Sequence, residues 1–286
     1  KMGAGISTVD NYYHLTADKL RGCEFFFTTV TVTGTESMMM TATLAEGKTI
    51  LSNCAMEPEI VALAEYLNSV GAKISGAGTP VITIEGVAKI GGGEFTTIAD
   101  RIEAGTFAIM AAATNSELTI SDCRPDHLES LLAMFTKIGV PYTSTATTLT
   151  ILKHGVLKAL DIKTHEYPGF PTDLQSPYTI LMTQAEGMAI VHETIYDRRL
   201  LFTDMLTQMG ANIIMCDPHR VVISGPTKLH GHKLTSPDLR AGIAMIIAGM
   251  IASGKTEIDN IYQIDRGYER IDERLRSLGA EIERIN

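Results

Sequence analysis

An aspartate in the stretch Phe170–Gln175 is the first candidate for chemistry. Pro171 cannot continue a helix, whereas Thr172 and Asp173 are residue types that cap the start of one. An apolar run follows at 178–185, so we expect Asp173 at or just inside a helix N-terminus. Local sequence alone favours a helix cap. The functional alternative is a general base for a substrate hydroxyl, which requires an ionised carboxylate in the right place.

Arginines recur beside aspartates where helices are expected to begin. They are Arg101 after Asp100, Arg240 two residues after Asp238, and Arg266 after Asp265. Aspartate suits the positive end of the helix dipole, but arginine does not. A surface ion pair would explain any one of these sites. Three together favour a converging anion site, because helix N-termini and guanidinium groups bind phosphate or carboxylate.

A short signature, in which an apolar residue precedes Gly and then Ala or Val, ends four expected amphipathic helices. Its glycines are Gly71, Gly139, Gly210 and Gly279, so successive copies lie 68, 71 and 69 residues apart. A fixed period is typical of a repeated structural unit. The near-equal spacings argue against chance recurrence of a glycine at a helix end.

Each repeat holds the same elements: an apolar helix, a β-prone run, a more polar helix with one apolar face, and short β-prone runs after the glycine. The apolar helices are expected at 36–45, 101–113, 173–185 and 238–252, the β-prone runs at 48–51, 117–120, 188–191 and 255–258, and the polar helices at 58–70, 125–138, 197–209 and 266–278. Helices that are apolar all round must be buried. We therefore expect helices inside and sheets outside, the reverse of the common α/β layering.

The expected fold class is α/β, an inside-out α/β barrel of repeated β-α-β-α-β-β units, four of them complete in this chain. The turn at 91–93 ends the first full unit and predicts a boundary near residue 98, with domains at 1–98 and 99–286. Gly3 lies 68 residues before Gly71 in a matching signature. The chain is therefore expected to be a fragment that begins at the tail of a unit and lacks its N-terminal part.

Composition excludes several classes of protein. The 286 residues, 45% hydrophobic and 20% charged, indicate a globular protein with room for two domains. A net charge of −9 argues against a general binder of nucleic acid or anionic membranes, and no apolar run reaches the roughly 20 residues of a membrane span. The four cysteines and eight histidines show no metal-ligand spacing. We expect reduced thiols in a cytosolic compartment and no nucleotide cofactor.

Seven motifs occur in order along the chain. They are Ala42–Gly47, Glu57–Ile60, Asp100–Thr106, Phe170–Asp173, Glu193–Tyr196, Asp238–Ala241 and Ile264–Arg270. Together they resemble the UDP-N-acetylglucosamine 1-carboxyvinyltransferases, a family of enolpyruvyl transferases, from about Tyr12 to Ile285. Any one motif is weak, whereas the ordered set is highly specific.

The resemblance implies a fold and a reaction. The family has two domains of three units, six in all, with the active site in the cleft between them. It transfers the enolpyruvyl group of phosphoenolpyruvate to the 3-hydroxyl of UDP-N-acetylglucosamine by addition and then elimination of phosphate, the first committed step of bacterial peptidoglycan synthesis. This implies a cytoplasmic enzyme with these two substrates and with no metal, organic cofactor, nucleic acid or membrane partner. The oligomeric state stays open.

The resemblance also implies roles for individual residues. Asp173 resembles the aspartate that deprotonates the sugar hydroxyl, and Thr172 lines the same site. Arg240 and Arg266 resemble the arginines that hold the phosphate and carboxylate of phosphoenolpyruvate. The other substrate-binding residues implied are Arg101, Arg199, Ile195, Tyr196, Thr29, Val30, Thr31, Val32 and Glu57. By local sequence, Glu57 and the run 197–199 are helix starts.

The chain departs from the family at several places. Thr29 and Thr33 stand where some members have Lys and Gly in the diphosphate-binding segment, and Met56 replaces an arginine that is common there. Contacts with the diphosphate are therefore less firmly implied than the role of Asp173. The family's Lys-Asn pair and its mobile loop with a catalytic Cys or Asp are expected upstream of Lys1. We therefore expect that this chain alone does not turn over.

Two other interpretations remain. One is an enzyme of the same fold, 3-phosphoshikimate 1-carboxyvinyltransferase, against which the motifs at 170–173 and 265–270 argue. The other is a non-catalytic remnant that binds a UDP-sugar or a partner. Calorimetry with UDP-N-acetylglucosamine separates these cases, because a competent site should bind it.

Overall fold

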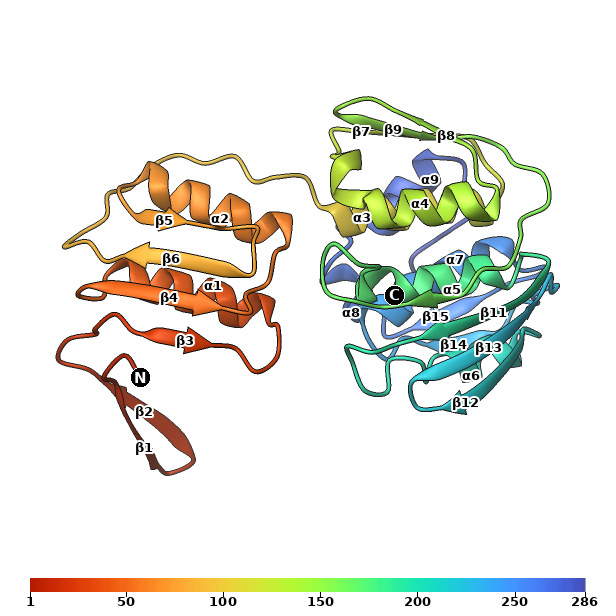
Figure 1. Ribbon diagram of the computed structural model, residues 1–286. Coiled ribbons are helices and arrows are strands. Elements are labelled where there is room, and N and C mark those ends of the chain that lie inside the picture. The colour runs from red at the N-terminus through yellow and green to blue at the C-terminus, as the bar shows by residue number, and fades with distance from the viewer. Residues whose placement is uncertain (286) are drawn as a thin grey trace. The chain divides into compact units, whose positions relative to one another are not determined.

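The chain forms two compact units in the computed structural model, which describes residues 1–285 (Figure 1). Unit 1 comprises Lys1–Ile98 together with Glu166–Pro168. Unit 2 comprises Ala99–His165 and the chain from Gly169 onward. Both are mixed α/β and have cores of buried apolar side chains.

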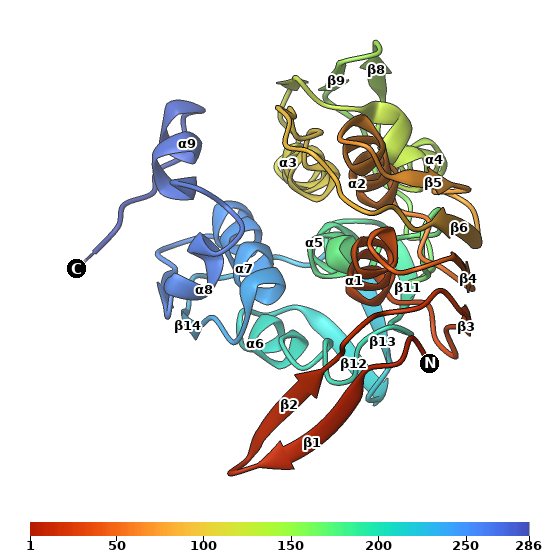
Figure 2. The same ribbon diagram turned by 90° about the vertical axis from the view of Figure 1, so that its left-hand side faces the viewer.

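Unit 1 consists of a β-hairpin and a sheet covered by two helices. The hairpin strands are β1 (Gly5–Val9) and β2 (Tyr12–Thr16), the sheet strands are β3 (Glu24–Phe26), β4 (Lys48–Ser52), β5 (Lys73–Ser75) and β6 (Val81–Glu85), and the helices are α1 (Val32–Thr43) and α2 (Pro58–Ser69). The sheet order is β3-β4-β6-β5, with β3 parallel to β4 and the other pairs antiparallel. Both helices lie on one face of this sheet (Figure 2), where Met39, Leu51 and Ile60 are fully buried.

Unit 2 is built from three sheets and a set of packed helices. Its strands are β7 (Leu118–Ser121), β8 (Tyr142–Ser144), β9 (Thr148–Ile151), β10 (Ile162–Lys163), β11 (Gly187–His192), β12 (Asn212–Asp217), β13 (Arg220–Gly225), β14 (Lys233–Thr235) and β15 (Glu257–Asp259). Its helices are α3 (Arg101–Ala113), α4 (Glu129–Ile138), α5 (Gln175–Met182), α6 (Thr203–Gln208), α7 (Leu239–Ile251), α8 (Tyr262–Asp265) and α9 (Ile271–Ser277), with 3₁₀ turns at Pro125–Leu128 and Thr172–Leu174. The strand orders are β7-β9-β8, β10-β11-β13-β12 and β14-β15.

Helices α3, α5 and α7 form the interior of unit 2, and the sheets lie outside them (Figures 1 and 2). All eight residues of α5 are buried, as are ten of the thirteen residues of α3. A Cβ at Gly105 would lie 2.7 Å from Cδ1 of Leu174, so the small residue permits close packing here. The predicted burial of these apolar helices is confirmed.

The predicted repeat is visible in the sheets and in the helix ends. Both β3-β4-β6-β5 and β10-β11-β13-β12 begin with a parallel pair and continue with antiparallel pairs. The four signature glycines have φ between 93° and 110°, the left-handed region in which glycine ends a helix without strain. The prediction that these glycines end helices is confirmed.

The prediction of four complete units is not confirmed. Among the described residues, only the two four-stranded sheets hold the full set of strands. No strand precedes α3 to pair with β7, and no strand follows α9 in residues 278–285. Residues 1–285 therefore form two sets with all strands present and two with fewer, besides the N-terminal hairpin.

Helix α1 was predicted to be buried on every side, and this is wrong. One face is buried around Met39, whereas Met40 is 47% exposed. The helix also begins at Val32, four residues earlier than predicted, because Thr31 caps it: the Thr31 hydroxyl accepts the N–H of Gly34 at 3.2 Å. The apolar composition of a helix does not show how many of its faces find a neighbour.

All four cysteines are free thiols. Cys54 and Cys123 are buried, and burial raises the pKa of both. Within residues 1–285, every helix is too short or too polar to cross a membrane.

Candidate active site

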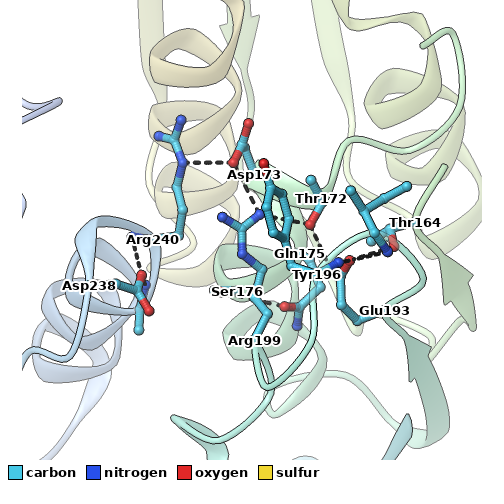
Figure 3. Close-up of polar contacts among 12 residues, drawn as sticks. Thr164, Thr172, Asp173, Gln175, Ser176, Glu193, Tyr196, Arg199, Asp238 and Arg240 are labelled. Atoms are coloured by element: carbon cyan, nitrogen blue, oxygen red, sulfur yellow. Dashed lines mark hydrogen bonds and ion pairs between the residues drawn. The ribbon is translucent and has the colours of Figure 1, made fainter. Parts of the chain in front are cut away.

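Asp173 lies in the 3₁₀ turn that leads into α5, as its sequence predicts, but it does not cap a helix through its side chain. Its Oδ1 accepts two charged hydrogen bonds instead, from Nη1 of Arg199 at 3.1 Å and from Nε of Arg240 at 3.0 Å (Figure 3). The side chain of Asp173 is 32% exposed, so solvent or a ligand can reach it. We call Asp173, Thr172, Arg199 and Arg240 the Asp173 cluster.

Arg240 is placed by the first turn of α7. Asp238 caps this helix and accepts the backbone N–H of Arg240 at 2.7 Å and that of Ala241 at 2.9 Å, as predicted. Burial alone would lower the pKa of the Arg240 guanidinium, but the adjacent Asp173 carboxylate and Tyr268 raise it above its ordinary value. Arg240 is therefore a fixed cation, with only 19% of its side chain exposed.

Arg199 reaches the cluster from a turn. Its Nη1 also donates to Oγ1 of Thr172 at 2.7 Å. Its guanidinium carbon lies 4.3 Å from the ring centroid of Tyr196, a cation–π contact (Figure 3). Arg199 is therefore held on three sides, by a hydroxyl, a carboxylate and an aromatic ring.

The helix predicted at 197–209 is shorter in the structure. Residues 197–202 form turns, and α6 begins only at Thr203. Arg198 has a φ of 62°, which a right-handed helix cannot contain. The run 197–199 is therefore not a helix start, and this break is what turns Arg199 toward Asp173.

The backbone N–H groups of Ile195 and Tyr196 already have hydrogen-bond acceptors within the protein. Both N–H groups donate to Oε1 of Glu193, at 2.8 Å and 3.1 Å. Any backbone contact between Ile195 and a ligand would therefore use its carbonyl. Both side chains are exposed, as a contact with a large ligand requires.

The other two arginines lie at different kinds of helix end. Arg101 is the first residue of α3, which Asp100 caps as predicted. The prediction that Arg266 opens an amphipathic helix is wrong, because it lies at the C-terminal cap of α8, and α9 begins at Ile271. The exposed Arg266 donates from Nη1 to Oε1 of Gln263 at 3.1 Å.

The predicted binding residues of unit 1 lie at two helix starts. Thr29 and Val30 precede α1, Thr31 caps it and Val32 is its first residue. Glu57 occupies the cap position of α2 but makes no capping bond through its side chain. It is 7% exposed, and its Oε2 has no hydrogen-bond partner among residues 1–285. A buried carboxylate oxygen without a partner is costly, so this position suits a bound donor.

Sequence reasoning gave no role to two buried residues that complete the site. The hydroxyl of Tyr268 hydrogen-bonds with Thr106 Oγ1 at 2.9 Å and receives a longer bond from Arg240 Nη1 at 3.5 Å. Glu193 is fully buried and bonds Thr172. Both lie inside quoted motifs, but only a three-dimensional structure shows which partners they reach.

The Asp173 cluster combines a carboxylate with two cations. Both arginine bonds fall on Oδ1, which leaves Oδ2 to accept a hydroxyl proton, since residues 1–285 provide no hydrogen bond to Oδ2. Each guanidinium has further N–H donors that can hold a phosphate or a carboxylate. This arrangement can remove a proton from a hydroxyl beside a bound anion. No three His, Cys, Asp or Glu side chains in the described chain are grouped to hold a metal ion.

Residues 1–275 match the family described as EPSP synthase (3-phosphoshikimate 1-carboxyvinyltransferase). A protein named UDP-N-acetylglucosamine 1-carboxyvinyltransferase from Koribacter versatilis is 45% identical over 285 residues, which cover 100% of this chain and 66% of that protein. One of the same name from Solibacter usitatus is 46% identical over 287 residues, covering 100% and 68%.

The chain thus spans about two thirds of the length of these relatives. Among solved structures, the enolpyruvyl transferase NikO from Streptomyces tendae superposes with a TM-score of 0.90 at 24% identity, over 99% of this chain and 70% of that one. At this identity the likeness shows the fold, a mixed α/β architecture shared over 99% of the chain.

Proposed function

Because this chain belongs to the EPSP synthase (3-phosphoshikimate 1-carboxyvinyltransferase) family, we propose that its protein transfers the enolpyruvyl group of phosphoenolpyruvate to the 3-hydroxyl of UDP-N-acetylglucosamine and releases phosphate. The names of relatives at 45% and 46% identity support this acceptor over 3-phosphoshikimate. The protein is then a transferase of bacterial peptidoglycan synthesis, acting in the cytoplasm on two small-molecule substrates.

One observation supports the proposal most: Arg199 and Arg240 converge on a single oxygen of Asp173. In the proposed addition step, Oδ2 of Asp173 accepts the proton of the sugar hydroxyl while the sugar oxygen bonds to C2 of phosphoenolpyruvate. C3 gains a proton from a donor that the described residues do not assign. Elimination then breaks the bond from C2 to the phosphate oxygen, and C3 loses a proton to restore the double bond.

The remaining residues take supporting roles in this proposal. Arg240 and Arg266 hold the phosphate and the carboxylate of phosphoenolpyruvate, for which the exposed Arg266 side chain would leave Gln263. The residues proposed to contact the sugar nucleotide are Thr172, Ile195, Tyr196, Arg199, Arg101, Thr29, Val30, Thr31, Val32 and Glu57. For the fold, we propose six repeated units in two inside-out α/β domains, and the two sheets of equal strand order support this repeat.

The test is phosphate release from the two substrates, measured in a protein of the relatives' length. Asp173→Asn keeps the size of the side chain but removes the base, so turnover should fall by about 10²- to 10⁴-fold. Asp161→Asn is the matched control: Asp161 is exposed and accepts the N–H of Ile190 at 2.7 Å, so the control should keep the wild-type rate. Wild-type turnover in Asp173→Asn would overturn the base assignment.

A second measurement decides between acceptors. Calorimetry with this chain should detect binding of UDP-N-acetylglucosamine, and the longer protein should release phosphate with it and not with 3-phosphoshikimate. Release with 3-phosphoshikimate alone would move the protein to the other branch of the family. Binding of the sugar nucleotide without turnover in the longer protein would favour a non-catalytic role.

A further inference from the structure

Glu193 is a buried carboxylate behind the Asp173 cluster. It follows β11 directly and is 0% exposed. Its Oε1 accepts from Oγ1 of Thr164 at 3.1 Å and from the N–H groups of Ile195 and Tyr196 at 2.8 Å and 3.1 Å. Its Oε2 accepts from Oγ1 of Thr172 at 2.8 Å (Figure 3). Glu193 is the acceptor in each of these bonds, which suits a carboxylate and not an amide.

The bond to Thr172 sets the direction of that hydroxyl. A threonine hydroxyl has one proton to donate and two lone pairs that accept. Because its proton goes to Glu193, its lone pairs are left for Nη1 of Arg199 at 2.7 Å. The same Nη1 donates to Oδ1 of Asp173 at 3.1 Å. Through Thr172, Glu193 thus determines where Arg199 meets Asp173.

Glu193 also supports the opposite side of Arg199. Its bonds to the N–H groups of Ile195 and Tyr196 hold residues 193–196 in a tight turn. That turn places the Tyr196 ring 4.3 Å from the Arg199 guanidinium carbon. Two of the three contacts that hold Arg199, the hydroxyl and the ring, therefore depend on one buried carboxylate.

We propose that Glu193 is a positioning residue of the active site. It does not touch the substrate; it orients Thr172 and the 193–196 turn, and through both it holds Arg199 against Asp173. The kinetic consequence rests on the proposed function. The structural consequence does not, because the orientation of Arg199 can be measured without any substrate.

The substrate-free experiment uses nuclear magnetic resonance of the arginine side chains. The carboxylate of Glu193 offers two oxygens to its hydrogen-bond donors, whereas the amide in Glu193→Gln offers only one. Either the Thr172 hydroxyl or the 193–196 turn therefore loses its acceptor. In both cases one support of Arg199 is lost. We expect the side-chain N–H signals of Arg199, assigned by their loss in Arg199→Lys, to shift and broaden. They should stay unchanged in the control Asp161→Asn. Unchanged Arg199 signals in Glu193→Gln would overturn the proposal.

The kinetic experiment uses a protein of the relatives' length with both proposed substrates. Glu193→Gln should lower kcat by about 10- to 100-fold, the range expected when a hydrogen bond to a charged group is lost, and should change KM less. In a Thr172→Val background, the same substitution should cost less, because the hydroxyl, one of the two routes through which Glu193 acts, is already absent. Equal losses in both backgrounds would indicate general support of the fold and would contradict the proposal.

The two failures can be told apart. If the unaltered protein neither binds nor turns over these substrates, the proposed function fails, and the Arg199 signals still decide the role of Glu193. If the unaltered protein converts these substrates, and Glu193→Gln has the same rate and unchanged Arg199 signals, only the positioning role fails.

Discussion

The sheets β3-β4-β6-β5 and β10-β11-β13-β12 share one strand order, but the connections that follow their first strands carry different chemistry. Between β3 and α1, Thr31 caps the helix through its hydroxyl. Between β10 and α5, Asp173 leaves the helix uncapped and pairs with Arg199 and Arg240. The same sheet topology is therefore followed by a helix cap in unit 1 and by a candidate active site in unit 2.

The residue after the second strand shows the same contrast. Asn53 follows β4 and donates from Nδ2 to the backbone carbonyl of Phe27 at 2.8 Å, across to the end of the neighbouring strand. Glu193 follows β11 and instead bonds the hydroxyl of Thr172 in the Asp173 cluster. The connection after the first strand and the residue after the second strand, and not the sheet, therefore distinguish the site from its structural copy.

The largest effect, on stability, is expected at a glycine that the two sheets have in common. Each has a glycine that faces the backbone just after a helix: a Cβ at Gly86 would lie 1.5 Å from the carbonyl oxygen of Ala45, and one at Gly225 would lie 2.5 Å from that of Ala185. Alanine at either position should destabilise its unit by about 3 kcal/mol, and more at Gly86. Urea unfolding followed by circular dichroism measures this, and an unchanged midpoint in Gly86→Ala would contradict it.

The next largest effect is expected at Thr172, and it is an effect on turnover. Thr172→Val keeps the shape of the side chain but removes the hydroxyl between Glu193 and Arg199. We expect turnover to fall about tenfold or more, since Glu193 loses a hydrogen bond. Thr172→Ser keeps the hydroxyl and serves as the control, with a rate close to wild type. Equal rates in the Val and Ser variants would show that the hydroxyl is not used.

A smaller effect is expected for Thr31→Val in unit 1. This substitution removes a helix cap, so it should lower the stability of unit 1 by about 1 kcal/mol. Amide hydrogen exchange in α1 measures the loss within this unit. Thr31→Asp restores a capping side chain and should recover the protection, whereas an equal loss in both variants would argue against the capping bond.

The smallest effect is expected for Asn53→Gly. The substitution removes the bond to Phe27 but relieves the left-handed backbone of Asn53, whose φ is 60°. We expect a net loss of stability below about 1 kcal/mol, since the two effects oppose each other. Asn53→Ala loses the bond without that relief and should be the less stable of the two. The reverse order, measured by urea unfolding, would contradict this account.

Features that repeat along the sequence could be predicted, because each is set by local chemistry. The signature glycines end helices since glycine adopts the left-handed conformation without strain. The apolar helices of unit 2 are buried because their composition permits nothing else. The exposed face of α1 was not predictable, because burial depends on which neighbours pack against a helix.

The site itself was predictable only in part, because its contacts join residues far apart in sequence. Asp173 can cap a helix by its local sequence, but arginines 26 and 67 residues away take its oxygen instead. The turn at 197–199 depends on a left-handed Arg198, which no periodicity reveals. The resemblance to a known family singled out Asp173, Arg199 and Arg240, while the supporting contacts of Glu193 and Tyr268 required the structure.

The complete burial of α5 has a consequence for how the site can respond to a ligand. The turn that carries Asp173 runs straight into this helix, so its backbone can move only if the core of unit 2 opens as well. Arg199 instead lies on a turn outside regular structure. Asp173 is thus the immobile reference point of the site, and adaptation to a bound anion should fall to the arginine side chains and the 193–199 segment, on the fast timescale of side-chain and loop motion.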